Sequence, residues 1–473
     1  MNPPRILIAG DRSSSGKTTI VAGLLSALRA RGLAVQPFKV AMDYIDPSYH
    51  TWITGRFCRN LDGYVMTPEA VKEVYSHGSR GADISVVEGV RGLYEGYDGD
   101  LGSTAQIAKM LHCPVIFVVD ARSITRSAAA LVQGYMDFDP QVQIRGVILN
   151  KIGSQRHADK AIREIERHAG VEVVGVIHRN DDMHLAMRHL GLVPVLEGER
   201  RHQGFVERLG RIRKIVEEGL DIDRILELAG EAPPLPEVEE DLYRPGQSGR
   251  GLRVGIAQDE AFNFYYRENI ELFELAGAEV VPVSPVHDQS LPANLDGLYI
   301  GGGYPELYMA ELSGNEGMRR SIVRAWEAAM PIFGECGGLM YLAREIEWTV
   351  PGQGGGERGV ERPESYPMVG LVPGRARMGS RRIVSYVSGT FGRDCVLGRS
   401  GSRFLGHEFH HSELVMEEEA TYAMRLDRGT GISEGRDGVV DGNMLASYVH
   451  IHAASYRGFP SAFIQACHDA KNK

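Results

Sequence analysis

The N-terminal segment carries the feature that most constrains the fold. The apolar run at residues 6–9 leads into a turn rich in Gly and Ser, and Gly16-Lys17-Thr18-Thr19 then opens a helical pattern. In such a turn the backbone N–H groups and the helix N-terminus converge on one point, where they can hold phosphate oxygens. Five residues separate Gly10 from Gly16, one more than in the standard phosphate loop, and one subfamily of these loops has this spacing. We therefore predict, in preference to an ordinary Gly-Lys-Thr turn, an ATP-binding loop that consists of Gly10, Ser15, Gly16, Lys17, Thr18 and Thr19.

Apolar runs alternate with helical patterns in both halves of the chain. In the first half they predict buried strands at residues 6–9, 84–87, 115–119, 144–149 and 173–177. In the second half they predict strands at residues 253–257, 279–283, 297–300 and 331–333. Buried strands that alternate with helices are typical of α/β domains with parallel sheets and helices on both faces.

A segment rich in Pro, and then in Gly and Ser, separates the two alternations. Residues 231–236 read Glu-Ala-Pro-Pro-Leu-Pro, and residues 244–249 read Arg-Pro-Gly-Gln-Ser-Gly. This composition marks a linker. We predict a first domain at residues 1–200, a helical and Pro/Gly-rich linker at residues 201–250, and a second domain at residues 251–473.

Charge, hydropathy and cysteine content exclude several classes of protein. Lys and Arg total 52 against 62 Asp and Glu, and the formal net charge of -10 disfavours general binding to nucleic acid. No apolar run approaches the roughly 18 residues of a membrane span, and the N-terminus has no signal-peptide pattern. The five cysteines form no CxxC pair, which argues against a disulfide framework or a structural zinc site. We expect a cytoplasmic protein without a membrane partner.

Carboxylates near the phosphate loop are candidate ligands of Mg²⁺. Glu88 ends a predicted strand and is followed by glycines, so it can face the nucleotide together with the Thr18 hydroxyl. Asp43 and Asp46 lie three residues apart, close to Lys39. From chemistry alone they can hold a metal, orient an activated carboxyl group, cap a helix or form a surface ion pair.

A second chemical centre is predicted in the C-terminal half. Gly334-Glu335-Cys336-Gly337-Gly338 lies between a strand and a helix, and this pattern repeats the nucleophile elbow with sulfur in place of oxygen. The thiol needs a base, and the best candidates are His450 and His452, at the end of an apolar strand predicted at residues 446–452, with His407, His410 and His411 as a second set. Backbone N–H groups can stabilise an oxyanion here, and the candidates are Gly302, Gly303 and Gly337.

The ordered set of these elements resembles the glutamine-dependent tetrapyrrole a,c-diamide synthases. The resemblance extends over nearly the whole chain, from the phosphate loop through residues 43–47, 88–94, 188–192 and 259–266 to the cysteine elbow, residues 406–410 and residues 448–452. It implies a P-loop parallel-sheet synthetase domain similar to dethiobiotin synthetase and a class I-type glutamine amidotransferase α/β domain. The enzyme would be a glutamine-hydrolysing carbon–nitrogen ligase.

The resemblance also implies roles for individual residues. Cys336 would attack the amide of L-glutamine and release ammonia, with His450 as base, and free ammonia could replace glutamine. Most class I members have a Glu two residues after that histidine, whereas this chain has His452. The synthetase domain would use ATP and Mg²⁺ to form an acyl phosphate, with Thr18, Glu88 and Asp43 at the metal. Its substrate site would contain Lys39, Asp43, Tyr44, Asp46, Arg91 and Glu95, the last where many relatives have Asp.

The identity of the tetrapyrrole depends on smaller differences. Ala41-Met42 replaces the Gly-Pro common in corrin enzymes, and residues 60–64 look more like the methanogen branch. We therefore favour Ni-sirohydrochlorin, in biosynthesis of the nickel cofactor of methanogenesis, and keep cobyrinate, in cobalamin biosynthesis, as the alternative. Arg91, with Arg56 and Arg59, could pair with the carboxylates of this anionic substrate. A homodimer is compatible with the sequence, which does not fix the oligomeric state.

A partition-type P-loop ATPase, acting as a switch, is the alternative from a different class. Such a protein has a similar phosphate loop. This interpretation leaves Cys336, His450 and the glycines at 301–303 without a role.

Overall fold

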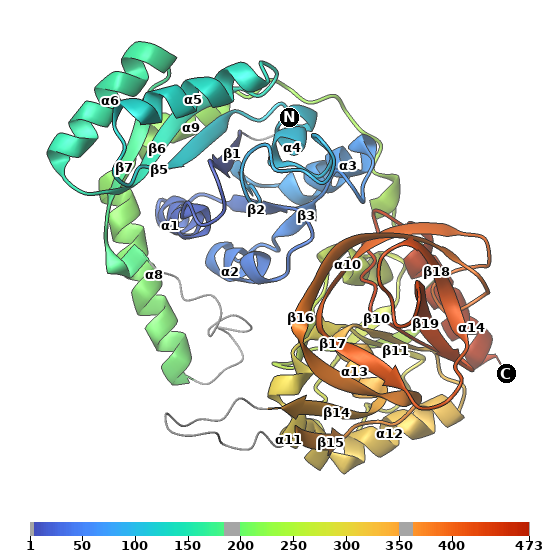
Figure 1. Ribbon diagram of the computed structural model, residues 1–473. Coiled ribbons are helices and arrows are strands. Elements are labelled where there is room, and N and C mark those ends of the chain that lie inside the picture. The colour runs from blue at the N-terminus through green and yellow to red at the C-terminus, as the bar shows by residue number, and fades with distance from the viewer. Residues whose placement is uncertain (1–3, 184–198, 350–362, 473) are drawn as a thin grey trace, which may run out of the picture. The chain divides into compact units, whose positions relative to one another are not determined.

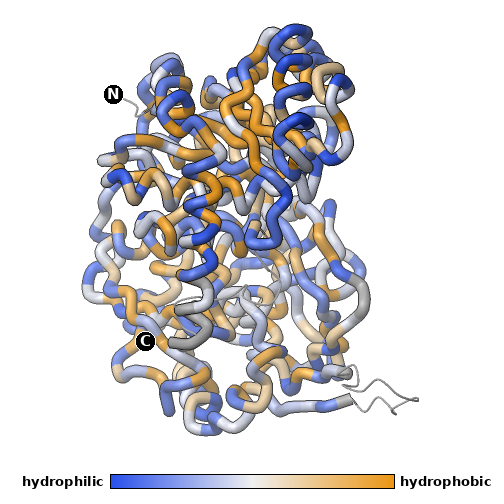
Figure 2. Tube along the Cα trace, turned by 90° about the vertical axis from the view of Figure 1, so that its left-hand side faces the viewer, coloured by the Kyte–Doolittle hydropathy of each residue, from blue (hydrophilic) through white to orange (hydrophobic). Residues whose placement is uncertain are grey.

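The computed structural model describes residues 4–183, 199–349 and 363–472. The chain divides into two units, Met1–Glu240 and Asp241–Lys473, and both are α/β structures (Figure 1). Hydrophobic and hydrophilic stretches alternate along the chain in Figure 2, as expected where each element buries only part of its surface. Residues 188–192, part of the resemblance above, lie outside the described residues.

The described part of the first unit has one sheet of seven strands, all paired in parallel. The strand order is β3-β2-β4-β1-β5-β6-β7. The bounds are β1 Arg5–Gly10, β2 Val35–Val40, β3 Arg59–Leu61, β4 Ile84–Glu88, β5 Val115–Asp120, β6 Ile144–Ile152 and β7 Val173–His178. The prediction of a parallel sheet is confirmed, and β1, β4, β5, β6 and β7 are the five predicted strands.

Helices cover both faces of this sheet. Their bounds are α1 Lys17–Ala30, α2 Ile45–Thr54, α3 Pro68–Ser79, α4 Thr104–Met110, α5 Arg126–Phe138, α6 Gln155–Ala169, α8 Glu199–Gly219 and α9 Ile222–Gly230. Ile6 and Ile8 of β1 contribute to one apolar core with residues of α1, α8 and α9. On the other face Phe38 of β2 packs on Tyr75 of α3, and Phe117 of β5 packs on Tyr135 of α5.

The predicted linker at residues 201–250 needs correction. Its helical part is α8 and α9, which belong to the first unit. The physical reason is burial, because Ile212 and Val216 of α8 and Ile225 of α9 pack into the core around α1. Along the chain, the division between the two units falls instead between Glu240 and Asp241, within the segment rich in Pro and Gly.

The second unit has an extended mixed sheet. Its strand order is β10-β8-β11-β13-β20-β19-β18-β16-β14-β15, and β17 pairs with β16. The first five strands are parallel, whereas β19, β18 and β17 pair in antiparallel fashion. The bounds are β8 Arg253–Ala257, β9 Phe262–Phe264, β10 Glu279–Val283, β11 Gly297–Ile300, β12 Gly302–Gly303, β13 Ile332–Glu335, β14 Ala343–Thr349, β15 Pro363–Pro367, β16 Val372–Phe391, β17 Arg403–Met416, β18 Tyr422–Arg428, β19 Arg436–Asp441 and β20 Met444–Ser447.

Five helices are described in this unit: α10 Arg267–Leu275, α11 Met309–Gly314, α12 Glu316–Glu327, α13 Gly337–Leu342 and α14 Gly458–Lys471. Among the described residues of the whole chain, no helix is both long and apolar enough to cross a membrane. The short helix α13 begins directly after Cys336 and packs against β13 and β14. It is the element that follows the predicted nucleophile.

Candidate active sites

The predicted phosphate loop lies between β1 and α1. Gly10 ends β1, Ser15 is fully buried, and Thr18 and Thr19 lie in the first turn of α1. Gly16 caps the helix with a φ of 95°, a left-handed conformation that disfavours side chains. The side-chain amide of Asn150, at the end of β6, donates to the Ser15 carbonyl at 2.8 Å. Sequence analysis had not identified Asn150, because only the parallel sheet brings β6 close to this loop.

Lys17 lies at the centre of the loop. Its ammonium donates to the carbonyls of Arg91 at 2.5 Å and Arg12 at 3.3 Å. Burial lowers the pKa of Lys17 to about 8, and the positive charge of Lys39 adds to this effect. A phosphate anion would favour the charged form, so the position suits the phosphate-binding role that the sequence predicts.

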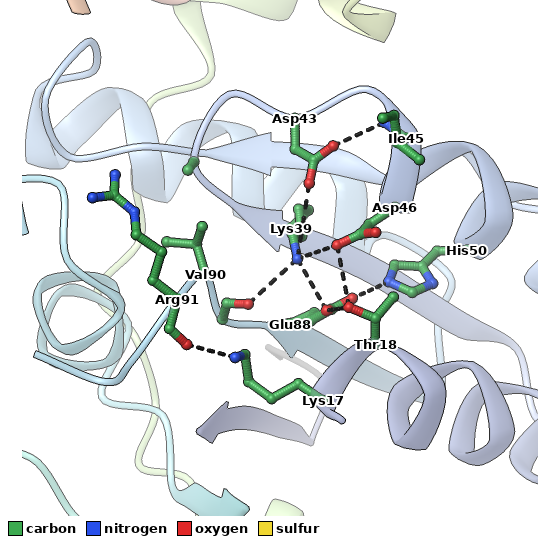
Figure 3. A network of polar contacts seen from close by, with 12 residues as sticks. Lys17, Thr18, Lys39, Asp43, Ile45, Asp46, His50, Glu88, Val90 and Arg91 are labelled. Atoms are coloured by element: carbon green, nitrogen blue, oxygen red, sulfur yellow. Dashed lines mark hydrogen bonds and ion pairs between the residues drawn. The ribbon is translucent and has the colours of Figure 1, made fainter. Parts of the chain in front are cut away.

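A cluster of charged residues adjoins the loop; we call Thr18, Lys39, Asp43, Asp46, His50 and Glu88 the Lys39 cluster (Figure 3). The Lys39 ammonium is 2.5 Å from an Asp46 carboxylate oxygen and 3.0 Å from a Glu88 oxygen. The Thr18 hydroxyl donates to Glu88 at 2.6 Å. The strand order explains the meeting, because β4 lies between β2 and β1 and Glu88 is opposite Lys39 in the register.

Electrostatics keeps Lys39 and Glu88 charged despite their burial. Burial alone would raise the pKa of Glu88, but Lys39 and His50 hold it well below its usual range. Burial would lower the pKa of Lys39, whereas Asp46 and Glu88 raise it above its ordinary value. Asp43 differs, since burial and then the charge of Asp46 raise its pKa.

The structure brings most, but not all, of the predicted synthetase residues together. The Asp43 side chain is 28% exposed at the edge of the Lys39 cluster, 4.0 Å from the Lys39 ammonium. Tyr44 precedes α2 and is buried. Arg91 and Glu95 are exposed in the turns after β4, and the Arg91 guanidinium points away from the cluster (Figure 3).

His50 is a member of the Lys39 cluster that sequence analysis missed. Its Nε2 contacts a Glu88 oxygen, and both side chains are completely buried. A signal was present, because Asp46 and His50 are four residues apart on α2 and therefore share one face of that helix.

The donor atoms of the cluster fit Mg²⁺. Mg²⁺ prefers oxygen ligands and usually takes one or two carboxylates, together with waters and substrate phosphates. The Thr18 hydroxyl and the Glu88 carboxylate provide such oxygens next to the loop, with Asp46 3.3 Å from the hydroxyl. Within the described ranges no group of three His, Cys, Asp or Glu could bind a metal by itself, so substrate phosphates would have to complete the site.

The second centre is built on the sharp turn between β13 and α13. Cys336 has φ 52° and ψ -96°, a strained backbone conformation for a residue with a side chain. Its backbone N–H donates to the Ser447 carbonyl at 2.7 Å, and its thiol lies 3.6 Å from the Phe409 carbonyl. The predicted elbow is therefore present, next to the strand that leads to His450.

β20 ends at Ser447, so His450 lies three residues beyond it and not within the strand that the sequence had predicted at residues 446–452. Its Nδ1 is 2.6 Å from a carboxylate oxygen of Glu335, the residue before Cys336. Burial would lower the pKa of His450, but Glu335 and then Cys336 raise it to about 10. Sequence analysis quoted Glu335 without giving it a role.

The glycine loop at β12 lies against these residues. A Cβ at Gly302 would lie 2.9 Å from Cε1 of His450, so a side chain there would collide with the imidazole. A Cβ at Gly337 would lie 3.0 Å from the backbone nitrogen of Gly303. The structure thus brings together Gly302, Gly303 and Gly337; their oxyanion role stays a prediction.

The alternative bases are placed less favourably. The His407 ring stacks on His450 with centroids 4.9 Å apart, and burial holds its pKa well below the ordinary value. His410 stacks on Tyr448, and burial lowers its pKa to about 4. His411 is exposed. Among the described ion pairs of the candidate bases, His450 contacts Glu335 and His452 contacts Glu268. The partner of His450 is the neighbour of Cys336 in the chain, which favours His450 as the base.

Comparison with known proteins finds a different domain family in each half of the chain. Residues 6–193 match the CobQ/CobB/MinD/ParA nucleotide binding domain, and residues 253–458 match the CobB/CobQ-like glutamine amidotransferase domain. The chain is 58% identical to the cobyrinate a,c-diamide synthase of Methanosarcina acetivorans over 98% of this chain and 95% of that protein. It is 56% identical to the corresponding synthase of Methanosarcina barkeri, over 100% of this chain and 97% of that protein.

A third relative carries a slightly different name. The chain is 42% identical to the hydrogenobyrinate a,c-diamide synthase of Streptomyces coelicolor, over 98% of this chain and 97% of that protein. These matches confirm the predicted fold class, a nucleotide-binding domain followed by a glutamine amidotransferase domain.

Proposed function

The chain belongs to the cobyrinate a,c-diamide synthase family of glutamine-hydrolysing amidoligases, and we propose that it amidates the a and c acetate carboxylates of cobyrinate. The observation that carries this choice is the full-length similarity to two proteins that both bear the cobyrinate name. It favours the alternative of the sequence analysis over Ni-sirohydrochlorin.

Ammonia would be produced in the second unit. The Cys336 sulfur attacks the side-chain amide carbon of glutamine, and His450 passes a proton to the leaving nitrogen, so that ammonia departs and a glutamyl thioester remains. The N–H groups at Gly302, Gly303 and Gly337 would face the oxyanion. Water then hydrolyses the thioester to glutamate and restores the thiol.

The carboxylate would be activated in the first unit. Carboxylate is a poor electrophile, so a substrate carboxylate oxygen first attacks the γ-phosphorus of ATP. An acyl phosphate forms and ADP departs. Ammonia then attacks the acyl phosphate, and the amide forms as phosphate departs. Lys17 and the phosphate loop would hold the transferred group, and Lys39 would balance the negative charge around it.

Magnesium belongs to this proposal as well. Thr18 and Glu88 would hold it, with Asp43 or Asp46 close by, and it would neutralise charge on the phosphates. The exposed Arg91 is a candidate partner for the carboxylates of the tetrapyrrole.

Ni-sirohydrochlorin is the second candidate substrate. It is favoured by Ala41-Met42, which departs from the corrin-type sequence just before Asp43, a residue at the edge of the Lys39 cluster. A partition-type ATPase has no use for a cysteine elbow with its histidine, which argues against that alternative.

The test is to incubate the enzyme, ATP and glutamine with cobyrinate or with Ni-sirohydrochlorin, and to identify products by mass spectrometry. We expect a gain of two amide groups on cobyrinate. Cys336→Ser should abolish glutamine-dependent amidation but not ammonium-dependent amidation. Cys395→Ser, which lies outside both sites, should leave both activities unchanged. Preference for the nickel substrate would overturn the substrate assignment, and loss of ammonium-dependent activity in Cys336→Ser would overturn the two-site account.

A further inference from the structure

The site around Cys336 contains a carboxylate that the family resemblance does not explain. Most class I glutamine amidotransferases have a Glu two residues after the histidine, but His452 occupies that position here. In the structure His452 instead pairs with Glu268, its Nε2 lying 3.1 Å from a Glu268 oxygen. The contact to His450 comes from Glu335.

We propose that Glu335 is the positioning residue that orients His450 toward Cys336, so that the site is a Cys336–His450–Glu335 triad. This inference rests on the proposed function, because it concerns the glutaminase half of that reaction. The third member would thus come from the residue before the nucleophile instead of from the segment after the histidine.

The geometry supports this role at both carboxylate oxygens. Glu335 Oε1 lies 2.6 Å from Nδ1 of His450, and Oε2 accepts a hydrogen bond from the Tyr299 hydroxyl at 3.0 Å. The Glu335 and His450 side chains are each 1% exposed, so water does not compete for the contact. A carboxylate acceptor fixes the proton on Nδ1 and leaves Nε2 as the basic nitrogen, the arrangement that a thiol's base requires.

Strand pairing explains how the contact forms. β13 and β20 are parallel neighbours, and Glu335 is opposite Ser447, three residues before His450. The carboxylate and the nucleophile therefore share one strand end. Both face the segment that carries the base.

The surroundings favour one positive charge at this point. The carboxylate of Glu335 and the side chain of Cys336 stabilise the protonated His450. Burial keeps the stacked His407 neutral, because it holds the pKa of that residue well below its ordinary value. Tyr299 and Tyr265, which face the same region, have pKa values raised by burial and stay neutral.

The Glu268–His452 pair provides a matched control. It is also a buried Glu–His contact of the second unit, with both side chains 1% exposed. The Tyr243 hydroxyl donates a hydrogen bond to Glu268 at 3.2 Å. A general loss of buried carboxylates would affect both pairs alike, whereas a triad involves Glu335 alone.

The experiment measures glutaminase kinetics of the full chain for Glu335→Gln, Glu268→Gln and Cys336→Ala. We expect Glu335→Gln to lower kcat by about 10³- to 10⁴-fold with KM within about threefold, as for loss of the orienting carboxylate in serine proteases. Ammonium-dependent amidation should remain, because it would take place in the first unit. Glu268→Gln should stay within about tenfold of wild type.

A second readout separates orientation from structural support. Alkylation of Cys336 by iodoacetamide near neutral pH should slow at least about tenfold in Glu335→Gln and not in Glu268→Gln, because His450 then stabilises the thiolate less. If Glu335→Gln fails to fold, Glu335→Asp decides. Aspartate keeps the negative charge, but its shorter side chain withdraws the carboxylate from His450. A displacement of this kind is expected to lower kcat by about 10²-fold.

Several outcomes overturn the proposal. The triad is refuted if Glu335→Gln keeps glutaminase activity within about threefold of wild type, or if Glu335→Asp has wild-type activity. An equal loss of glutaminase kcat in Glu268→Gln would show that the effect comes from the general loss of a buried carboxylate. Glutaminase that survives Cys336→Ala contradicts the proposed function itself, a result distinct from failure of the triad.

Discussion

Lys39 is the buried cation on which the synthetase site depends, and its removal should be costly. Its ammonium is 2.5 Å from Asp46 and 3.0 Å from Glu88, and its side chain is only 4% exposed. With an effective dielectric constant of about 20, each contact represents a gross attraction of about 5 to 7 kcal/mol, which the cost of burying the charges largely offsets. Breaking such a pair by removing one partner costs about 3–5 kcal/mol, because the other charge stays buried without its partner.

We therefore expect Lys39→Met to lower the free energy of unfolding of the first unit by about 3–5 kcal/mol near pH 8. The loss should shrink as the pH falls toward 5, because carboxylates without the ammonium take up protons more readily. The assay is urea unfolding followed by Trp52, which lies in α2 beside the cluster. Trp326 and Trp348, the other two tryptophans, are replaced by Phe to isolate this signal.

Lys109 is the matched control. It contacts Asp100 at 2.8 Å and Asp139 at 2.6 Å, but its side chain is 23% exposed. An exposed pair contributes about 0–1 kcal/mol, so Lys109→Met should change stability by no more than that. If Lys39→Met costs less than about 1 kcal/mol, or if Lys109→Met costs as much as Lys39→Met, burial does not make the Lys39 contacts strong and the reasoning fails.

Three further predictions concern Gly16, His50 and Asp437. Gly16→Ala puts a side chain at φ 95° and its Cβ 2.2 Å from Asn150 Nδ2, so ATP affinity by calorimetry should fall at least about tenfold. Gly32→Ala, the control at φ 85° in open space, should leave ATP affinity unchanged. Equal losses of ATP affinity in the two variants would contradict a role for the clash. His50→Ala removes the Glu88 partner and should lower ammonium-dependent amidation while glutaminase persists; unchanged amidation argues against the contact. Burial raises the pKa of Asp437 to about 7, so the folded state keeps a proton that the unfolded state has released above about pH 4. Stability should therefore fall between about pH 4 and 7 in the wild type, and Asp437→Asn should be more stable by up to about 4 kcal/mol at pH 8; parallel pH profiles of unfolding would refute this.

The sequence predicted most strands of the parallel sheets, because a strand buried on both faces reads as a continuous apolar run. It did not predict β2, whose sequence Val-Gln-Pro-Phe-Lys-Val contains a proline and two polar residues. Lys39 is buried there because Asp46 and Glu88 balance its charge, and that compensation exists only in the folded chain. The antiparallel strands β16 and β17 were also missed, since their polar and apolar residues alternate and carry a weaker signal.

Functional residues followed the same rule. Gly16, Lys17, Cys336 and Gly337 belong to local patterns whose spacing along the chain is informative. Glu335 and His50 are different, since each is defined by a contact with a residue far away in the sequence. A one-dimensional pattern contains no information about such a pair unless the strand order is known.

Strand order also explains why both centres lie where they do. In parallel sheets the carboxyl ends of neighbouring strands meet at one edge, so residues that end adjacent strands become neighbours regardless of their separation in sequence. β2, β4 and β1 are adjacent in the first unit, which brings Lys39, Glu88 and the phosphate loop together. β11, β13 and β20 are adjacent in the second, which joins the glycine loop, Cys336 and the approach to His450. A carboxylate that serves His450 can therefore come from the end of a neighbouring strand as readily as from the segment after the histidine, and Glu335 occupies such a strand end.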